Sequence, residues 1–156
     1  RKRAIRAMVD GRIRVVRDDF SGQITSVRTE NLQQSLNRGA VAVAPPFADS
    51  HDGYLNVDGD RAAAAIAGAL YASELMIFTN VRGLYRQFPD EDTFASRVTM
   101  DRIENAIDWA HGRMKRKVIA ARDALDTGVS RVIIGDGRIE NPVQYALNGN
   151  GTEFLR

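Results

Sequence analysis

The stretch Tyr54–Tyr85 reads YLNVDGDRAAAAIAGALYASELMIFTNVRGLY, and it decides the fold. Its polar turn, Asn56–Asp60, precedes a helix of small apolar residues over Ala62–Ala72. The apolar run Leu75–Phe78 then predicts a buried strand, which ends in the polar loop Thr79–Gly83. Open α/β sheets bind ligands at the carboxyl ends of their strands, where this loop would lie. We therefore expect both ends of the stretch to face one anionic ligand.

Before this stretch, the sequence predicts a β-hairpin followed by a short strand. Ala4–Val9 and Arg12–Val16 alternate around Asp10-Gly11, which is a strong hairpin signal. Gly22–Val27 predicts a third strand.

A helix and a strand are predicted next. The helix begins at Thr29, which is a suitable N-cap, and ends at Gly39. The small apolar run Ala40–Ala44 predicts a central strand. A polar loop over residues 47–53 then leads into the central stretch.

After the central stretch, further helices alternate with strands. In order, the sequence predicts a polar loop over Arg86–Ser96, an amphipathic helix over Thr99–Trp109, a helix over Met114–Thr127, a buried strand over Val129–Ile134, a turn at residues 135–137, a short helix over Val143–Leu147 and a last edge strand from about Thr152. This alternation predicts a parallel α/β sheet with helices on both faces.

Composition excludes several classes of protein. The chain has 156 residues, enough for one domain with a core, and no cysteine, which excludes disulfides and thiolate metal sites. No apolar run is long enough to span a bilayer and no signal peptide is visible, so a cytoplasmic protein without membrane contact is expected. A net charge of +2 argues against a dedicated nucleic-acid-binding module.

Positive charge is nevertheless concentrated at the amino terminus, against the single acid Asp10. The cations are Arg1, Lys2, Arg3, Arg6, Arg12, Arg14 and Arg17. Such a patch suits an acidic or phosphorylated partner. The charges also fit a solvated hairpin face, and on the charges alone that simpler interpretation is favoured.

The first of three polar clusters is Asn56, Asp58 and Asp60. Either acid suits the N-cap or first turn of the following helix. Capping accounts for one acid and leaves an amide and a second acid without a purpose. Two carboxylates with no third ligand nearby make a weak metal site, so we predict none.

The second cluster is Thr79-Asn80 with Gly83. It fits a plain strand exit with a turn glycine, and it equally fits a nucleotide-binding loop. The pattern alone is weakly specific.

The third cluster, GRMKRK over Gly112–Lys117, places four cations at the amino end of a helix. The helix macrodipole disfavours cations there, and a bound phosphate would offset the repulsion. We therefore favour a phosphate-binding function, although no Walker A sequence and no GxGxxG is present.

Several ordered motifs together resemble the amino acid kinase family. The motifs are NVDGDRAAAAIAGAL, FTNVRGLY, GRMKRKVIAARDAL, RVIIGDGRIENPV and GNGT. Within that family they resemble the acetylglutamate kinases, most closely the branch that phosphorylates 2-aminoadipate or glutamate attached to a small amino-group carrier protein in lysine and arginine biosynthesis. The resemblance implies the carboxy-terminal part of the family fold, a three-layer α/β/α sandwich with a mainly parallel sheet, plus the amino-terminal β-hairpin.

The resemblance also implies roles for named residues. Lys117 would neutralise charge on the transferred phosphoryl group, Asp60 would orient the catalytic lysines, and Asn56 would lie at the substrate end of the site. Asp58 is a less specific match, because relatives carry asparagine there. The residues implied to bind the nucleotide are Thr79, Asn80, Val81, Gly83, Tyr85 and Met114. ATP and Mg²⁺ are the implied cofactors, and a homodimer is the implied assembly.

One departure from the family is length. Relatives carry an earlier segment with a glycine-rich phosphate loop and a catalytic lysine, which this sequence lacks. We expect residues 1–48 to belong to the acceptor-binding lobe and 49–156 to form the ATP-binding lobe. The chain alone is expected to be inactive, so a non-catalytic nucleotide-binding fragment stays an alternative.

The acceptor also has an alternative. An N-acetylglutamate kinase acting on the free small molecule would share these motifs. A carrier protein would give a purpose to Arg1, Lys2, Arg3, Arg6, Arg12 and Arg14, because an acidic carrier would be steered by them.

Overall fold

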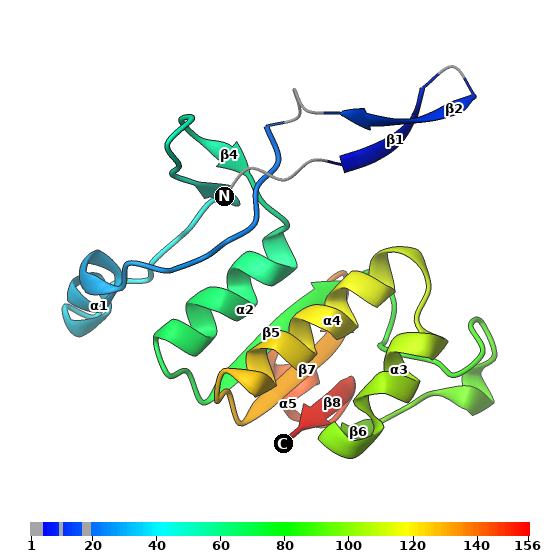
Figure 1. The fold of residues 1–156 in the computed structure, drawn as a ribbon. Coiled ribbons are helices and arrows are strands. Elements are labelled where there is room, and N and C mark those ends of the chain that lie inside the picture. Colours follow the sequence, from blue (N-terminus) through cyan, green and yellow to red (C-terminus); the bar gives the residue numbers. More distant parts are fainter. Residues whose placement is uncertain (1–4, 10, 17–19) are drawn as a thin grey trace.

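Four strands form the central sheet of the computed structural model, which describes residues 5–9, 11–16 and 20–156 (Figure 1). Their order across the sheet is β5 (Glu74–Thr79), β7 (Arg131–Asp136), β8 (Thr152–Leu155) and β6 (Arg97–Thr99). The pairings β5–β7 and β6–β8 are parallel, and β7–β8 is antiparallel. The sheet is therefore mixed and mostly parallel, which confirms the predicted α/β class.

Helices cover both faces of this sheet. On one face lie α2 (Gly59–Ala69), α3 (Ile103–Trp109) and α4 (Gly112–Asp126), and on the other lies α5 (Pro142–Leu147). Alternate residues of β7 explain the two layers, because successive side chains of a strand point to opposite faces. Val132 and Ile134 join the main core with α4, whereas Gly135 faces Ala146 of α5.

Helices α2 and α4 pack against each other at close range. Alanines dominate the buried side of α2, as they do on α4, so the two backbones approach closely. The approach is tight at Gly68, since a Cβ there would collide with the side chain of Thr127, the C-cap residue of α4. The small residues of α2 therefore serve its contact with α4 as well as the predicted contact with the sheet.

Capping residues fix the ends of these two helices. Asp58 is the N-cap of α2, and its carboxylate accepts a hydrogen bond of 3.1 Å from the backbone nitrogen of Arg61. Helix α2 ends at Ala69, earlier than predicted, where Tyr71 takes a positive φ of 54°. Helix α4 ends as predicted before Gly128, whose φ of 104° few other residues adopt.

The predicted hairpin and first helix are confirmed. Strands β1 (Ile5–Val9) and β2 (Arg12–Val16) pair in antiparallel register, and α1 covers Glu30–Asn37. Thr29 holds the N-cap position of α1 but makes no side-chain capping bond. Figure 1 shows the hairpin and α1 standing away from the central sheet.

Two predicted strands are wrong. An isolated bridge joins Ser21 to Asn56, and the backbone nitrogen of Gly22 donates to the carbonyl oxygen of Asn56 at 2.8 Å, but residues 23–27 and 40–44 form no strand. Val41 and Val43 are 89% and 90% exposed. A strand needs a neighbouring strand along its length to satisfy its backbone groups. In the described part of the chain, residues 23–27 and 40–44 belong to no such ladder.

The last strand is not an edge strand, as was expected, because β8 lies between β7 and β6. Within the predicted loop over 47–53, Phe47–Ala48 forms β3 and pairs with β4 (Leu55–Asn56). The loop over Arg86–Ser96 contains the 3₁₀ turn η1 (Glu91–Thr93), and another, η2 (Met100–Arg102), precedes α3. No helix in the described part of the chain has the length and apolar character needed to cross a membrane. The division into lobes at residue 48 stays a prediction.

Candidate active site

The two acids at the start of α2 have separate structural roles. The carboxylate of Asp58 caps the helix, so Asp60 in the first turn is left to other partners. Both carboxylate oxygens of Asp60 accept hydrogen bonds from Nζ of Lys117, at 2.9 and 3.1 Å. The second acid, which capping alone does not explain, is thus half of an ion pair.

This ion pair joins α2 to α4 and is largely sheltered from solvent. The side chains of Lys117 and Asp60 are 14% and 25% exposed. A second contact of opposite charges lies nearby, between Arg116 and Asp58, at 3.9 Å. The cations at the amino end of α4 are therefore partly balanced by acids from α2, which offsets the unfavourable macrodipole.

A cavity of about 340 Å³ opens at the carboxyl end of β5. Its walls come from the loop after β5 and from the junction between α3 and α4. The lining residues are Thr79, Asn80, Val81, Gly83, Leu84, Tyr85, Phe88, Trp109, Ala110, His111, Arg113 and Met114. All six residues predicted to bind a nucleotide lie on this one cavity, although a helix and a long loop separate Met114 from the others.

Helix α4 links the cavity to the ion pair. Met114 lines the cavity, and Lys117 follows three residues later in the same helix. Residues three apart lie on the same side of a helix, so the two side chains are neighbours. The axial step between them is about 4.5 Å. A ligand that fills the cavity and extends along α4 would therefore reach the Lys117–Asp60 pair.

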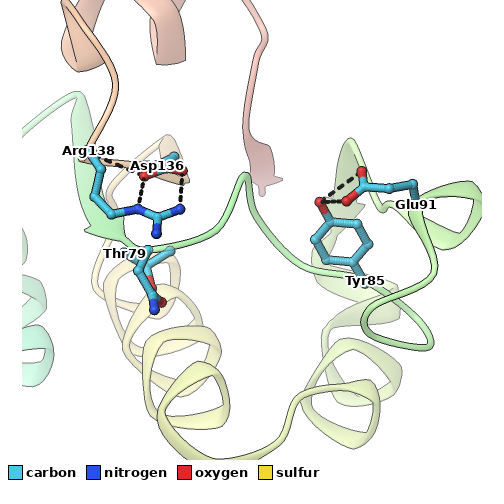
Figure 2. Close-up of polar contacts among 6 residues, drawn as sticks. Thr79, Tyr85, Glu91, Asp136 and Arg138 are labelled. Atoms are coloured by element: carbon cyan, nitrogen blue, oxygen red, sulfur yellow. Dashed lines mark hydrogen bonds and ion pairs between the residues drawn. The ribbon is translucent and has the colours of Figure 1, made fainter.

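The carboxyl ends of β5 and β7 meet beside this cavity. Thr79 pairs in register with Asp136, and the carbonyl oxygen of Thr79 accepts a 2.9 Å hydrogen bond from the backbone nitrogen of Gly137. Asp136 holds the guanidinium of Arg138 through bonds of 3.1 and 2.9 Å (Figure 2). The hydrogen bonds from Arg138 lower the pKa of the Asp136 carboxyl below its usual 3.8.

Asp136 and Arg138 were missed by the sequence analysis. The segment Gly135-Asp136-Gly137 was interpreted only as a turn, whereas Gly135 and Asp136 complete strand β7. The signal that identifies Asp136 is its position at the end of a strand parallel to β5, and the pairing of strands is not visible in the sequence.

Tyr85 is the most enclosed aromatic residue of the cavity wall. The residue is 5% exposed, and its hydroxyl donates to the two carboxylate oxygens of Glu91 at 3.0 and 3.1 Å (Figure 2). Burial raises the pKa of Tyr85 above 10.0, and the hydrogen bond to Glu91 raises it further. No pattern in the sequence indicated that Tyr85 and Glu91 would pair.

Other predicted residues lie apart from the cavity. Asn56 is exposed on β4 and is not among the lining residues. Arg12 is exposed on β2, and Arg6 and Arg14 are placed only by strand register, opposite Val15 and Ala7. Arg1, Lys2 and Arg3 lie outside the described residues.

The described residues do not gather a metal site. No group of three or more histidine, aspartate or glutamate side chains comes together in the part of the chain that the structure describes. Mg²⁺ as a cofactor stays a prediction.

Fold and site together define an α/β sandwich with a ligand cavity at the carboxyl end of its strands, next to a lysine–aspartate pair. The model of the amino acid kinase family matches residues 5–136. The chain belongs to the amino acid kinase family, which confirms the resemblance.

Known relatives also support membership of the amino acid kinase family. The chain is 40% identical to the LysW-aminoadipate kinase of Deinococcus radiodurans over 97% of this chain and 52% of the relative. It is 33% identical to the acetylglutamate kinase of Mycolicibacterium vanbaalenii over 96% of this chain and 52% of the relative. The chain thus spans about half the length of the curated relatives it matches.

A solved structure resembles the fold closely. N-acetylglutamate synthase from Neisseria gonorrhoeae, solved with coenzyme A and N-acetylglutamate, superposes with a TM-score of 0.81 at 28% identity. The match covers 99% of this chain and 35% of that one.

Proposed function

We propose that the protein transfers the γ-phosphoryl group of ATP to the side-chain carboxylate of an N-blocked 2-aminoadipate or glutamate. The product is an acyl phosphate, and the acceptor is carried on a small amino-group carrier protein. The observation that carries the proposal is the Lys117–Asp60 pair one helical turn from a cavity of nucleotide size. The proposal concerns the intact protein, because the chain spans about half of its curated relatives.

The cavity fits a nucleotide in size and character. Its volume of about 340 Å³ lies in the usual range for small-molecule sites, which are mostly apolar with a few polar groups. Tyr85, Phe88 and Trp109 offer aromatic surfaces for a base, and Thr79 and Asn80 offer polar groups at the strand end. When bound, ATP supplies the phosphoryl group.

The residues present suit transfer to a carboxylate. Such an acceptor has a pKa of about 4 and is already ionised at neutral pH, so no general base is needed. The protein must instead offset negative charge on the phosphoryl oxygens. Lys117 supplies that charge, and Asp60 orients its ammonium group without taking part in proton transfer.

The carrier-linked acceptor is favoured over the free molecule by two observations. The relative from Deinococcus radiodurans, named for an aminoadipate linked to LysW, is 40% identical, against 33% for the acetylglutamate kinase. Arg12 is exposed on the hairpin, where a positive surface would steer an acidic carrier. The homodimer implied by the resemblance stays a prediction.

A direct assay separates the alternatives. The intact protein is given ATP with carrier-linked aminoadipate, carrier-linked glutamate or free N-acetylglutamate, and acyl phosphate is trapped with hydroxylamine. We expect kcat/KM to be highest with a carrier-linked acceptor. Highest activity with N-acetylglutamate would favour the free-substrate kinase. ATP binding without turnover on any acceptor would favour the non-catalytic alternative.

A further inference from the structure

One wall of the cavity is formed by a loop that carries its own small core. The ring of Tyr85 packs edge-on against Phe88 and Phe94, with centroids 5.6 and 5.5 Å apart. Backbone bonds of 2.9 Å, from Arg86 to Thr93 and from Ala95 to Leu84, close the loop. These contacts hold the loop in a defined shape, and the loop in turn places Tyr85 at the cavity wall.

The hydroxyl of Tyr85 is anchored from outside the cavity. Glu91 is exposed in the turn η1 and does not line the cavity, yet its carboxylate accepts the Tyr85 hydroxyl through both oxygens. An enclosed tyrosine hydroxyl without a partner is costly, and a bond to a charged acceptor is stronger than one between neutral groups. Glu91 thus fixes the position of the Tyr85 ring.

The same loop also contacts the opposite wall. The guanidinium of Arg86, next to Tyr85, lies 5.5 Å from the ring centroid of Trp109 at the end of α3. Tyr85 and Trp109 both line the cavity. Displacement of Tyr85 would therefore alter the distance between the two walls.

We propose that Glu91 is a positioning residue for the nucleotide, acting through the Tyr85 hydroxyl to fix one wall of the cavity and so to set nucleotide affinity. This inference rests on the proposed function. It assigns Glu91 an effect on ATP binding and none on the transfer step, which belongs to Lys117 and Asp60.

The test is a double-mutant cycle in the intact protein. Glu91→Ala, Tyr85→Phe and the double variant are compared by ATP titration calorimetry and by steady-state kinetics. We expect each single variant to raise the Kd and KM for ATP about tenfold. The double variant should lose no more affinity for ATP than either single variant, because all three variants remove the same hydrogen bond. The kcat and the acceptor KM should stay within about twofold.

Two further variants separate positioning from a general structural role. Glu91→Gln keeps an acceptor oxygen and should recover most of the ATP affinity. Asp92→Ala removes the neighbouring carboxylate of the same turn and should leave the Kd for ATP unchanged. If Glu91→Ala does not fold, the Tyr85→Phe and Glu91→Gln variants still test the bond.

Several outcomes overturn the inference. They are an unchanged Kd for ATP in both Glu91→Ala and Tyr85→Phe, fully additive losses, or a lower melting temperature with unchanged Kd. In each case wild-type protein still binds ATP, so the proposed function stands. A wild-type protein that binds no ATP overturns both.

Discussion

The ammonium nitrogen of Lys117 lies 2.9 and 3.1 Å from the two carboxylate oxygens of Asp60, although the residues are 57 positions apart in the sequence. The pair exists because α2 and α4 pack together at small residues. Their close packing therefore determines both the stability of this region and the geometry of the proposed chemistry.

Removal of Lys117 should impair turnover far more than folding. In the intact protein we expect Lys117→Ala to lower kcat about 10²- to 10³-fold, because an electrostatic contact to the transferred group is lost. Arg102→Ala removes an exposed cation elsewhere and should leave kcat unchanged. A fall in melting temperature large enough to explain the lost activity would show a structural role instead.

Asp60→Asn should lower kcat by a similar factor. The amide keeps the shape of the side chain but loses the charge that orients Lys117, and the double variant with Lys117→Ala should be no worse than Lys117→Ala alone. Steady-state kinetics at saturating ATP and acceptor measure this. Unchanged turnover would remove Asp60 from the mechanism.

Two glycines of α2 should respond to alanine in opposite directions. Gly68→Ala should lower the free energy of unfolding by about 1–3 kcal/mol, because the new methyl group collides with Thr127. In Gly59→Ala the new methyl group meets only the side chain of Pro46, at an ordinary contact distance of 4.0 Å, and the variant should raise the free energy of unfolding by about 0.4–1 kcal/mol. Urea unfolding measures both, and destabilisation of equal size would contradict the close helix contact at Gly68.

Acid should weaken the protein partly through Asp136. Arg138 lowers the pKa of Asp136 in the folded state, so the folded protein binds the proton less readily than the unfolded chain. The resulting stabilisation is complete above the unfolded value near 3.8 and is lost as the pH falls through the lower folded value. Asp136→Asn should therefore flatten this acid limb in urea unfolding measured against pH. An identical pH dependence in wild type and variant would show that the pair does not contribute.

Charge reversal on the hairpin should affect the carrier-linked reaction selectively. Arg12→Glu should lower kcat/KM for a carrier-linked acceptor and weaken its dependence on salt, because electrostatic steering is screened by ions. Arg38→Glu makes the same change in net charge at the end of α1, away from the hairpin, and serves as the control. Equal effects of the two variants, or no effect of either, would argue against a carrier surface on β2.

The sequence predicted best what depends on local patterns. The helices, the hairpin and strands β5 and β7 follow from periodicity, glycine stops and turn residues, which act over a few positions. The order of strands across the sheet depends on contacts between distant segments. This is why β8 was wrongly expected at an edge and why the three-residue strand β6 was missed.

The site shows the same division. The polar clusters around Asp60, Thr79 and Lys117 were visible because each breaks a local rule, such as cations at the amino end of a helix. Which acid capped α2 and which paired with Lys117 depended on the packing of two helices. Glu91 and Asp136 could not be predicted from the sequence, since the position of each becomes significant only when the fold brings its partner near.

Trp109 is the one tryptophan in the chain, and it forms part of the cavity wall. Its indole emission therefore originates at the proposed binding site, so a ligand that enters the cavity would alter that emission directly. In this chain, ligand occupancy could be followed by intrinsic fluorescence, without a label and without a coupled assay.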